Sequence, residues 1–548
     1  MPLQVPKSPS LATQVSKAVV WNTLFVPLRL LAEVLATLVK LNQLSLASFG
    51  LLAIVSGASK VLGTGVDLGT TRALPKYIPE TNRSGGALAT LRLLQLILAA
   101  KVFLLLLVAG GLAIFQPSFL AYLRGLITGD QRLDDASQGV LLEFVAHYGW
   151  FLAVTIVALL FLGICYNMLM AYLSSFFKQR AWNSIDLAAK LLPQVLIVAA
   201  ILAGWDILGV LGAMILAPTI AVVLASWQVL RLRRELQADA VAPVVAMPLR
   251  AWRHWLPQGF IRYSAVSFLM TATDMIASVN FALFLAGDLG DVAVIWAGSS
   301  LVAMALGYLY TPMVGVQVPL FARVRQGEGG TLNGAYQSLV RLQLLLLVPG
   351  GVGLMLLAEP ALLVISPQYL VAAPIVWVLV PCLFVECLLT TAHNALIVYE
   401  RLSAIIASRL ITLAVVLPLA WLLPPVVGLV GVALAFGLAR VGSGLWVTAS
   451  GMRLLELRWP WRFTLRVCGA TVAMGLLILA TRGLLPPLPT EANLGERLIE
   501  AGWLLGLAGV GAVAFFATLR LLGGLDPQDR AQLERMKLPL KRWIMKLL

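Results

Sequence analysis

The sequence predicts an all-α, polytopic membrane protein with about fourteen transmembrane helices, and three observations support this fold class. The 548 residues are 60% hydrophobic and only 12% charged, whereas roughly a quarter of the residues in soluble domains are charged. Apolar runs of about 20 residues, the length that spans a bilayer, recur from one end of the chain to the other. Lysine and arginine concentrate in alternate connections between these runs.

The apolar runs set the order of the predicted helices. Each run is long enough to cross the hydrocarbon core as a helix, and no connection leaves room for a separate soluble domain. The predicted spans are 18–39, 44–66, 91–116, 144–170, 185–203, 207–229, 262–285, 292–316, 339–358, 372–398, 403–423, 426–449, 464–481 and 499–522.

The bases in the connections predict the orientation, because cytoplasmic loops of membrane proteins carry an excess of lysine and arginine. We expect a multi-pass protein of the cell (inner) membrane with both termini in the cytoplasm. The net charge of +15 then reflects contact with anionic membrane lipid, and we expect no nucleic-acid partner. With this orientation, the bases of the outer connections are Lys40, Arg124, Arg132, Arg482 and Arg497.

A weak internal repeat divides the chain into two six-helix lobes. An offset of about 245 residues lays Phe49–Glu80 over Val294–Glu328, and both segments pass from a small, apolar helix to a proline and then to bases. Transporters built from such repeats bind their substrates between the halves. The predicted parts are the N-terminal lobe 1–230 (spans 1–6), a basic cytoplasmic linker 231–257, the C-terminal lobe 258–450 (spans 7–12), spans 13–14 in 451–522, and a cytoplasmic amphipathic tail 523–548.

The stretch Leu62–Glu80, LGTGVDLGTTRALPKYIPE, marks the end of the second span. Its glycines loosen the helix end, and the side chain of Asp67 is placed to accept hydrogen bonds from free backbone N–H groups. We expect Pro75 and Pro79 to stop the helix, because proline lacks an N–H group and clashes with the preceding turn.

This stretch resembles the exit of the second helix in the polysaccharide flippase family of the multidrug/oligosaccharidyl-lipid/polysaccharide exporter superfamily, where "D-L-G" precedes "R-x-x-P-x-x-x-P-E"-like sequence. The segments PALLVISPQYLVAAPIVWVLVP, LLPPVVGLVGVALAFGLAR and DPQDRAQL are similar to that family in the same order. The segment SLASFG departs from the family pattern, so no residue role is taken from it. The resemblance implies two six-helix lobes, two further helices and transport of a lipid-linked oligosaccharide.

Four charged residues inside predicted spans of the N-terminal lobe form the candidate substrate site. A charge at the bilayer centre costs roughly 2.5–3.5 kcal/mol on insertion scales, so such residues usually face a bundle interior or water. We expect Arg29, Lys60 and Lys101 to form a cationic wall for an anionic head group such as a diphosphate, with Glu33 one helical turn from Arg29. The alternatives are a structural ion pair between Arg29 and Glu33, and a Lys60 side chain that reaches back to the interface.

Three titratable residues in the C-terminal lobe are candidates for binding a coupling ion. Asp274 lies midway along the seventh span, and Glu386 and His393, seven residues apart in the tenth, share a helix face. Either Asp274, or Glu386 together with His393, can carry a proton or a sodium ion. The alternative is hydrogen bonding between helices. Arg440, near the end of its predicted span, is interpreted as an interfacial anchor.

No motif for catalysis or cofactor binding is evident. The glycines of Gly63–Gly69 lack the strand–helix unit of a dinucleotide site, and the chain has no G-x-x-x-x-G-K-[ST] sequence. No Cys/His cluster has zinc spacing. We therefore expect no catalytic residue, no cofactor and no bound metal.

These observations, together with the resemblance, predict a flippase and not an enzyme. It would move polyprenyl-diphosphate-linked oligosaccharide from the cytoplasmic to the outer leaflet for polysaccharide biosynthesis, by alternating access. The closest alternative is a cation-coupled multidrug exporter of the same superfamily, which would prefer an acidic cavity. A membrane glycosyltransferase or polymerase is a further alternative, but Asp130, Asp134 and Asp135 of the one long outer loop have no obvious partner in the sequence.

Overall fold

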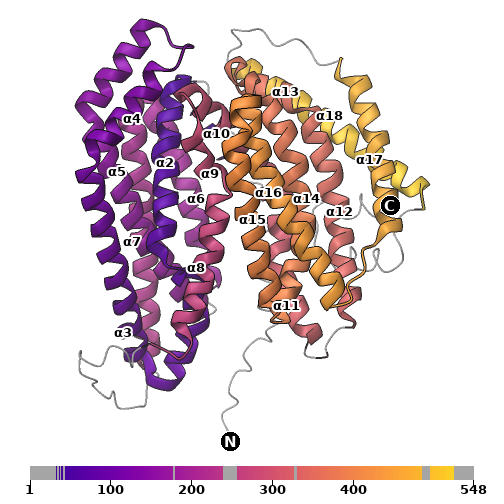
Figure 1. Ribbon diagram of the computed structural model, residues 1–548, viewed down its shortest axis with the longest axis horizontal. Helices are drawn as coiled ribbons and strands as arrows, with labels where there is room; N and C mark the ends of the chain where they lie inside the picture. The colour runs from indigo at the N-terminus through magenta and orange to yellow at the C-terminus, as the bar shows by residue number, and fades with distance from the viewer. Residues whose placement is uncertain are drawn as a thin grey trace, which may run out of the picture. The chain divides into compact units, whose positions relative to one another are not determined.

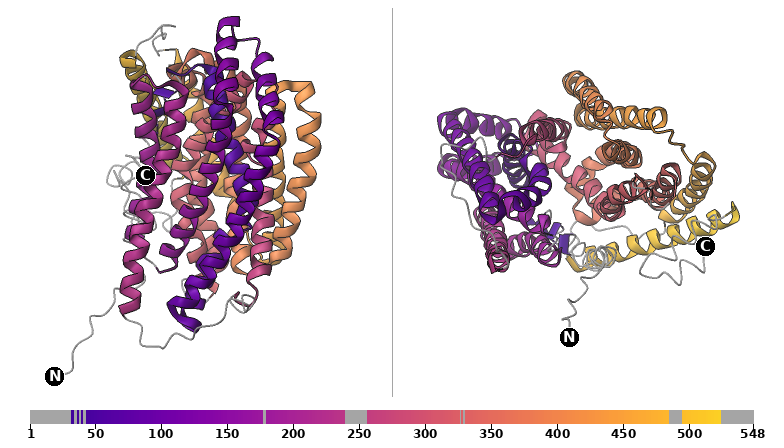
Figure 2. Two further views of the ribbon diagram at one scale, coloured as in Figure 1. Left: turned by 90° about the vertical axis from the view of Figure 1, so that its left-hand side faces the viewer. Right: turned by 90° about the horizontal axis from the view of Figure 1, so that it is seen from below.

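The chain folds into two compact units of long helices (Figure 1). The computed structural model describes residues 32–33, 36–37, 39–40, 43–176, 179–238, 256–325, 327, 330–483 and 494–523. The first unit extends to Met275 and includes Gly287–Gly290, and the second comprises Ile276–Ala286 and the chain from Asp291 onward. Figure 2 shows that the long helices within each unit run side by side.

The first unit is built around α5 (Asp135–Ser175), which is apolar around most of its circumference. Helices α2, α3, α4 and α7 all contact α5, whereas α6 packs chiefly on α7. The surrounding helices are α2 (Leu46–Asp67), α3 (Thr70–Ile114), α4 (Gln116–Thr128), α6 (Gln179–Leu202), α7 (Asp206–Ala238) and α8 (Phe260–Ile276).

The segment SLASFG begins α2. The Ser45 hydroxyl caps the helix by accepting a hydrogen bond from the Ser48 N–H group at 3.2 Å. Gly50 is required by space, because a Cβ atom there would lie 2.4 Å from the carbonyl oxygen of Leu289. This departure from the family pattern therefore has a local structural role in this chain.

The expectation that Pro75 and Pro79 stop the helix is wrong, since α3 continues through both. Pro75 is exposed and Pro79 is half-buried, whereas the residues that precede them, Leu74 and Ile78, are fully buried. The carbonyl groups that lose their N–H partners therefore lie on the more exposed side of the helix, where water or lipid head groups can satisfy them. The actual break is at Gly86, whose φ of 69° is left-handed. It separates an amphipathic segment from the membrane span Ala89–Ile114.

In the second unit, α14 (Ala373–Val398) is the central helix and contacts α11, α12, α15 and α16. Its fully or nearly fully buried residues, such as Val376 and Leu396, form much of the core. The other elements are α9 (Val279–Ala282), η2 (Leu283–Leu285), α10 (Leu289–Leu309), α11 (Thr311–Arg325), α12 (Leu332–Leu356), α13 (Ala358–Ile365), η3 (Pro367–Ala372), α15 (Leu402–Leu422), α16 (Pro424–Leu454), α17 (Trp461–Arg482) and α18 (Leu494–Leu521).

The last two helices, α17 and α18, pack on α12 and α13 at one side of the second unit (Figures 1 and 2). Two arginines attach them to main-chain carbonyls at helix ends. Arg482 forms an ion pair with Glu359 and donates to the carbonyl of Leu356 at 3.4 Å. Arg497, only 4% exposed, donates to the carbonyls of Val364 and Ile365, at 3.3 and 2.8 Å.

The helices confirm the all-α, polytopic membrane fold class. Within the described residues, twelve helices are long and apolar enough to cross a membrane. The bent pair Phe260–Ile276 and Val279–Leu285, counted as one span, is a thirteenth. These thirteen correspond in order to the predicted second to fourteenth spans. The predicted first span, 18–39, lies mostly outside the described residues.

Two parts of the predicted repeat can be compared within the described residues, and the repeat itself stays a prediction. In the first unit, α2 is followed by a break at Leu68–Gly69 and then by the amphipathic start of α3. In the second, α10 is followed by a break at Tyr310 and then by α11, whose Met313, Gln317 and Phe321 form a buried face. The packing of α6 on α7 is likewise repeated by α15 on α16.

The described residues cover only part of the predicted linker and tail. Helix α7 continues to Ala238, so the first eight residues of the predicted linker are helical, and residues 239–255 lie outside the described residues. All of the predicted tail except Gly523 also lies outside them. Most of α8, predicted to begin the C-terminal lobe, clusters with the first unit.

Candidate functional site

The exit of α2 is the first polar cluster, and it is built from backbone geometry. Leu68 and Gly69 have φ values of 51° and 70°, which break the helix between α2 and α3. A Cβ atom on Gly69 would lie 2.3 Å from the Ser264 carbonyl oxygen and 2.4 Å from the Phe268 nitrogen of α8. Glycine is therefore required at position 69 both by its conformation and by the close approach of α8.

Asp67 is the centre of this cluster. Its carboxylate accepts a hydrogen bond from the Thr71 N–H group at 3.4 Å and another from the Thr71 hydroxyl. The predicted role of Asp67 in satisfying free N–H groups is thus confirmed. The same carboxylate lies 2.7 Å from the ammonium group of Lys101, a side chain of α3 that is 1% exposed. A charge as buried as that of Lys101 requires such a partner.

Lys60 and Asp67 belong to a polar face of α2. Ser56, Lys60, Gly63 and Asp67 recur at the spacing that places residues on one side of a helix. Lys60 is exposed and the other three are half-buried, whereas Val55 and its neighbours on the opposite side are buried. Lys60 thus belongs to the more accessible side of a helix that is otherwise largely buried.

The pairing predicted for Arg29 and Glu33 is not described by the structure. Arg29 lies outside the described residues, and Glu33 is half-buried in the short described part that precedes α2. The substrate-binding role of Arg29, Glu33, Lys60 and Lys101 therefore stays a prediction.

Asp274, near the end of α8, lies close to a base from α3. The Arg72 guanidinium group is 3.6 Å from the Asp274 carboxylate, and the two side chains are 48% and 38% exposed. One turn further along α3, the ammonium group of Lys76 lies over the ring of Tyr263 of α8, 4.7 Å from its centroid. These contacts join the amphipathic start of α3 to α8.

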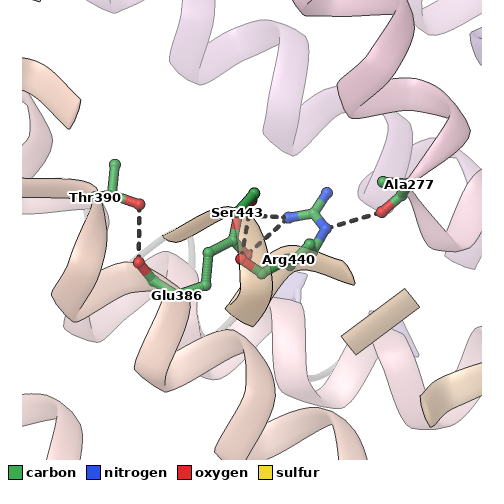
Figure 3. Close-up of polar contacts among 5 residues, drawn as sticks. All are labelled: Ala277, Glu386, Thr390, Arg440 and Ser443. Carbon is green, nitrogen blue, oxygen red and sulfur yellow. Dashed lines mark hydrogen bonds and ion pairs between the residues drawn. The ribbon is translucent and has the colours of Figure 1, made fainter. Parts of the chain in front are cut away.

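The second polar cluster lies in the second unit and connects three segments (Figure 3). The Arg440 Nη1 atom of α16 lies 3.0 and 3.3 Å from the two carboxylate oxygens of Glu386 on α14. The Arg440 Nε atom donates to the carbonyl oxygen of Ala277 at 2.8 Å. Both side chains are half-buried, at 28% and 26% exposed. The interpretation of Arg440 as an interfacial anchor is therefore wrong.

His393 lies on α14 as predicted, about 10 Å along the helix axis from Glu386. Its neighbours on α14 make hydrogen bonds to other helices. The Thr391 hydroxyl donates to Gln343 of α12 at 2.7 Å, and the Asn394 amide donates to Gln317 of α11 at 2.6 Å. Both glutamines are fully buried.

Asp130 belongs to the connection that was predicted to be a long outer loop. Asp130, which lacks an obvious partner in the sequence, is fully buried and accepts a hydrogen bond from the Gly290 N–H group at 2.8 Å. Among the described residues, no group of three or more His, Cys, Asp and Glu side chains is arranged to hold a metal ion.

The fold is similar to those of solved membrane transporters. A structure titled "Lipid II flippase MurJ, inward closed conformation" has a TM-score of 0.61 and 14% sequence identity, and the match covers 90% of this chain and 99% of that one. Inward- and outward-facing structures of a "multidrug resistance MATE family transporter of the MOP superfamily" each have a TM-score of 0.52, at 13% and 14% identity. They cover 78% and 80% of this chain, and 94% and 96% of their own chains.

These likenesses show the fold of the MOP superfamily, which is the superfamily that the sequence resembles. No protein-family model matches the chain. No curated protein sequence matches it either. The narrower resemblance to the polysaccharide flippase family stays a prediction.

Proposed function

We propose that this protein is an alternating-access transporter that moves a polyprenyl-diphosphate-linked oligosaccharide from the cytoplasmic to the outer leaflet. The observation that carries this proposal is the extent of the fold similarity, which covers 99% of the lipid II flippase chain. The match to the multidrug transporters covers a smaller share of this chain. The match to the lipid II flippase covers a larger share of this chain. Helices in the flippase that correspond to α17 and α18 would account for this difference.

The charges of the first unit support an anionic head group. The polar face of α2 includes Lys60, an exposed residue, and Arg29 lies in the preceding predicted span. A diphosphate binds such groups through charge-assisted hydrogen bonds, and arginine can contact it with two parallel bonds. Lys101 would contribute indirectly, since its ammonium group is engaged by Asp67 and holds the end of α2 in place.

A cation-coupled multidrug exporter is the second candidate, and the fold of the multidrug transporters favours it. A cavity for cationic drugs needs acids whose charges are available. Asp274 and Glu386 lie beside Arg72 and Arg440, which offset their charges. The arrangement therefore supports the anionic substrate better. Of the three residues predicted to bind a coupling ion, Asp274 and His393 stay proposals for that role, whereas the Glu386 carboxylate is engaged by Arg440.

Reconstitution of the full-length chain into liposomes tests the proposal. The probe is a short-chain polyprenyl diphosphate with a fluorescent sugar, and a membrane-impermeant quencher reports how fast the label changes leaflet. We expect protein-dependent flipping, and we expect Lys60→Ala to slow it about tenfold, the effect of losing one charge-assisted hydrogen bond. Lys190→Ala is the matched control, because Lys190 forms a local ion pair with Asp186 of the same helix.

The two candidates give opposite results in this assay. Protein-dependent export of a cationic dye, with no flipping of the lipid-linked sugar, would contradict the proposal and favour the multidrug exporter. Flipping that Lys60→Ala leaves unchanged would remove Lys60 from the head-group site.

The proposed orientation has its own test. Single cysteines at Gln237 and Gly329 should be shielded from an impermeant thiol reagent in intact cells, because both positions belong to connections rich in bases. A cysteine at Ser137 should be labelled, and the parent chain with its own four cysteines serves as the background control. Labelling at Gln237 in intact cells would overturn the orientation.

A further inference from the structure

The guanidinium group of Arg440 occupies a position that three oxygen atoms surround from two other segments. Two belong to the Glu386 carboxylate, at 3.0 and 3.3 Å, and the third is the carbonyl oxygen of Ala277, at 2.8 Å. Figure 3 shows the guanidinium group between the carboxylate on one side and the Ala277 carbonyl on the other. The side chain of Arg440 thus joins α14, α16 and the end of α8.

The Ala277 carbonyl is unusual because it lies at a break within a membrane span. Helix α8 ends at Ile276, α9 begins at Val279, and the two halves of the span are bent by 53°. Carbonyls at the C-terminal end of a helix lack partners within that helix and carry the negative end of its dipole. In transporters with broken helices, such carbonyls coordinate a sodium ion or lie at a proton site.

The Glu386 carboxylate completes a set of ligands suited to a monovalent cation. An ionised carboxylate and a main-chain carbonyl are the hard oxygen ligands that alkali and alkaline-earth cations bind. Apolar side chains lie within two helical turns of the pair, among them Leu379 of α14 and Phe436 of α16, and both help to line a small apolar cavity. Apolar surroundings strengthen the attraction between the carboxylate and any cation beside it.

We propose that Glu386 and the Ala277 carbonyl form a monovalent-cation site whose permanent occupant is the tethered guanidinium group of Arg440. A covalently attached cation cannot exchange with the solution, so this site needs no free sodium or potassium ion. The site accepts a free monovalent cation once the guanidinium group is removed. A coupling ion, where transport uses one, binds elsewhere in the molecule.

An ordinary structural ion pair makes a different prediction. Removal of Arg440 would then leave Glu386 to be neutralised by protonation or by water, and no added cation would restore stability in a saturable way. The proposal instead requires that a small cation bind in place of the guanidinium group and that this binding need Glu386.

Thermal unfolding of the full-length protein in lipid nanodiscs separates these cases without a transport assay. The proteins are wild type, Arg440→Ala, the double variant Arg440→Ala/Glu386→Gln, and Arg325→Ala. Arg325 forms an exposed pair with Glu400 and controls for general effects of added salt. Choline chloride is replaced stepwise by sodium, potassium or guanidinium chloride at constant ionic strength and at concentrations far below denaturing ones.

We expect the melting temperature of Arg440→Ala to lie below that of wild type and to rise by about 2–4 °C, saturably, with guanidinium or a small alkali cation. Wild type, Arg325→Ala and the double variant should lack this additional rise, and any smaller response to a cation should be the same in all three. Lack of any saturable response in Arg440→Ala, or an equal response in the double variant, would overturn the proposal.

If folded Arg440→Ala protein cannot be purified, the cation titration of wild type tests the proposal instead. Stabilisation of wild type by sodium that Glu386→Gln abolishes would show an exchangeable ion at this site and contradict a permanent occupant. Equal melting temperatures in sodium and choline agree with it, as does a sodium response that Glu386→Gln leaves unchanged. Since no substrate takes part, this result is independent of the flipping assay and of the proposed function.

Discussion

Each of the two units contains a partly or fully buried cation–carboxylate pair. The two pairs differ in which of the two side chains, the acid or the base, makes the further contacts. In the first unit, the Asp67 carboxylate is the centre and gathers Lys101 together with both donors of Thr71. In the second unit, the Arg440 guanidinium group is the centre and gathers Glu386 and the Ala277 carbonyl. Lys101 is 1% exposed, whereas Arg440 is 28% exposed.

The difference indicates what each pair contributes. The Asp67 carboxylate is held by the N–H group of Thr71, four residues further along the chain. Its pair with Lys101 therefore fixes a local helix end, and the buried ammonium group of Lys101 depends on Asp67 for its partner. Arg440 contacts Glu386, 54 residues away, and Ala277, 163 residues away. Its contacts therefore connect segments that are distant in the sequence. The first pair is expected to matter most for stability, and the second for the position of the broken span.

The largest expected effect is on the buried pair of the first unit. Lys101→Ala leaves the Asp67 carboxylate without its cation in a largely buried place, so we expect it to lower the free energy of unfolding by about 3–5 kcal/mol. Lys190→Ala removes an i,i+4 pair from a half-exposed position and should cost no more than about 0.5 kcal/mol. Unfolding in detergent micelles, followed by tryptophan fluorescence, measures both.

A double variant shows whether the charge or the shape of Lys101 matters. Lys101→Met with Asp67→Asn removes both charges at similar volume, and it should restore much of the stability lost in Lys101→Ala. Equal destabilisation by Lys101→Ala and Lys190→Ala would show that the buried Lys101–Asp67 pair contributes no more to stability than a half-exposed one.

The backbone at the α2–α3 break should be nearly as sensitive. In Gly69→Ala, a methyl group would enter a left-handed residue and approach the backbone of α8 to 2.3 Å, so we expect a loss of about 2–3 kcal/mol. Gly65→Ala is the matched control, because no atom lies within 4 Å of a Cβ there and alanine favours helix. The same unfolding measurement applies, and a Gly69→Ala protein as stable as wild type would show that α8 does not need this approach.

The pair of the second unit should respond to geometry more than to charge. Arg440→Lys keeps a positive charge but cannot reach the carboxylate and the carbonyl together, so we expect a loss of about 1.5 kcal/mol. Transport per folded molecule should also fall, even where most of the protein remains folded, because the position of the broken span changes. Full transport by Arg440→Lys would show that simultaneous contact of the guanidinium group with the Glu386 carboxylate and the Ala277 carbonyl is not needed.

The exposed pair of Arg72 and Asp274 should affect stability less than the Arg440 pair does. At 3.6 Å and with both side chains more than a third exposed, it should contribute less than about 1 kcal/mol. Asp274→Asn therefore tests the proposed coupling role cleanly. Unchanged dependence of transport on ion gradients in a normally folded Asp274→Asn protein would remove Asp274 from the coupling mechanism.

The spans were predictable from the sequence because a membrane helix needs a long apolar run whatever its neighbours are. The pairs were not, because they depend on helices that meet in space. Lys101 and Asp67 each stand out in the sequence, but nothing local places them together. Arg440 was interpreted as an anchor because it lies in the second half of its predicted span, 426–449, but α16 continues fourteen residues beyond it, to Leu454. An acid at similar depth in another span, here Glu386, was the one signal of its role.

The arginines of α17 and α18 have a consequence for synthesis of the chain. The carbonyls of Val364 and Ile365 are made more than 130 residues before Arg497 reaches them. At about 5–20 residues per second, the ribosome needs on the order of ten seconds to supply that donor. During this time the end of α13 must be satisfied by water, lipid head groups or the insertion machinery. A chain terminated before α18 would lack this donor, so the last helix is needed to satisfy the end of α13.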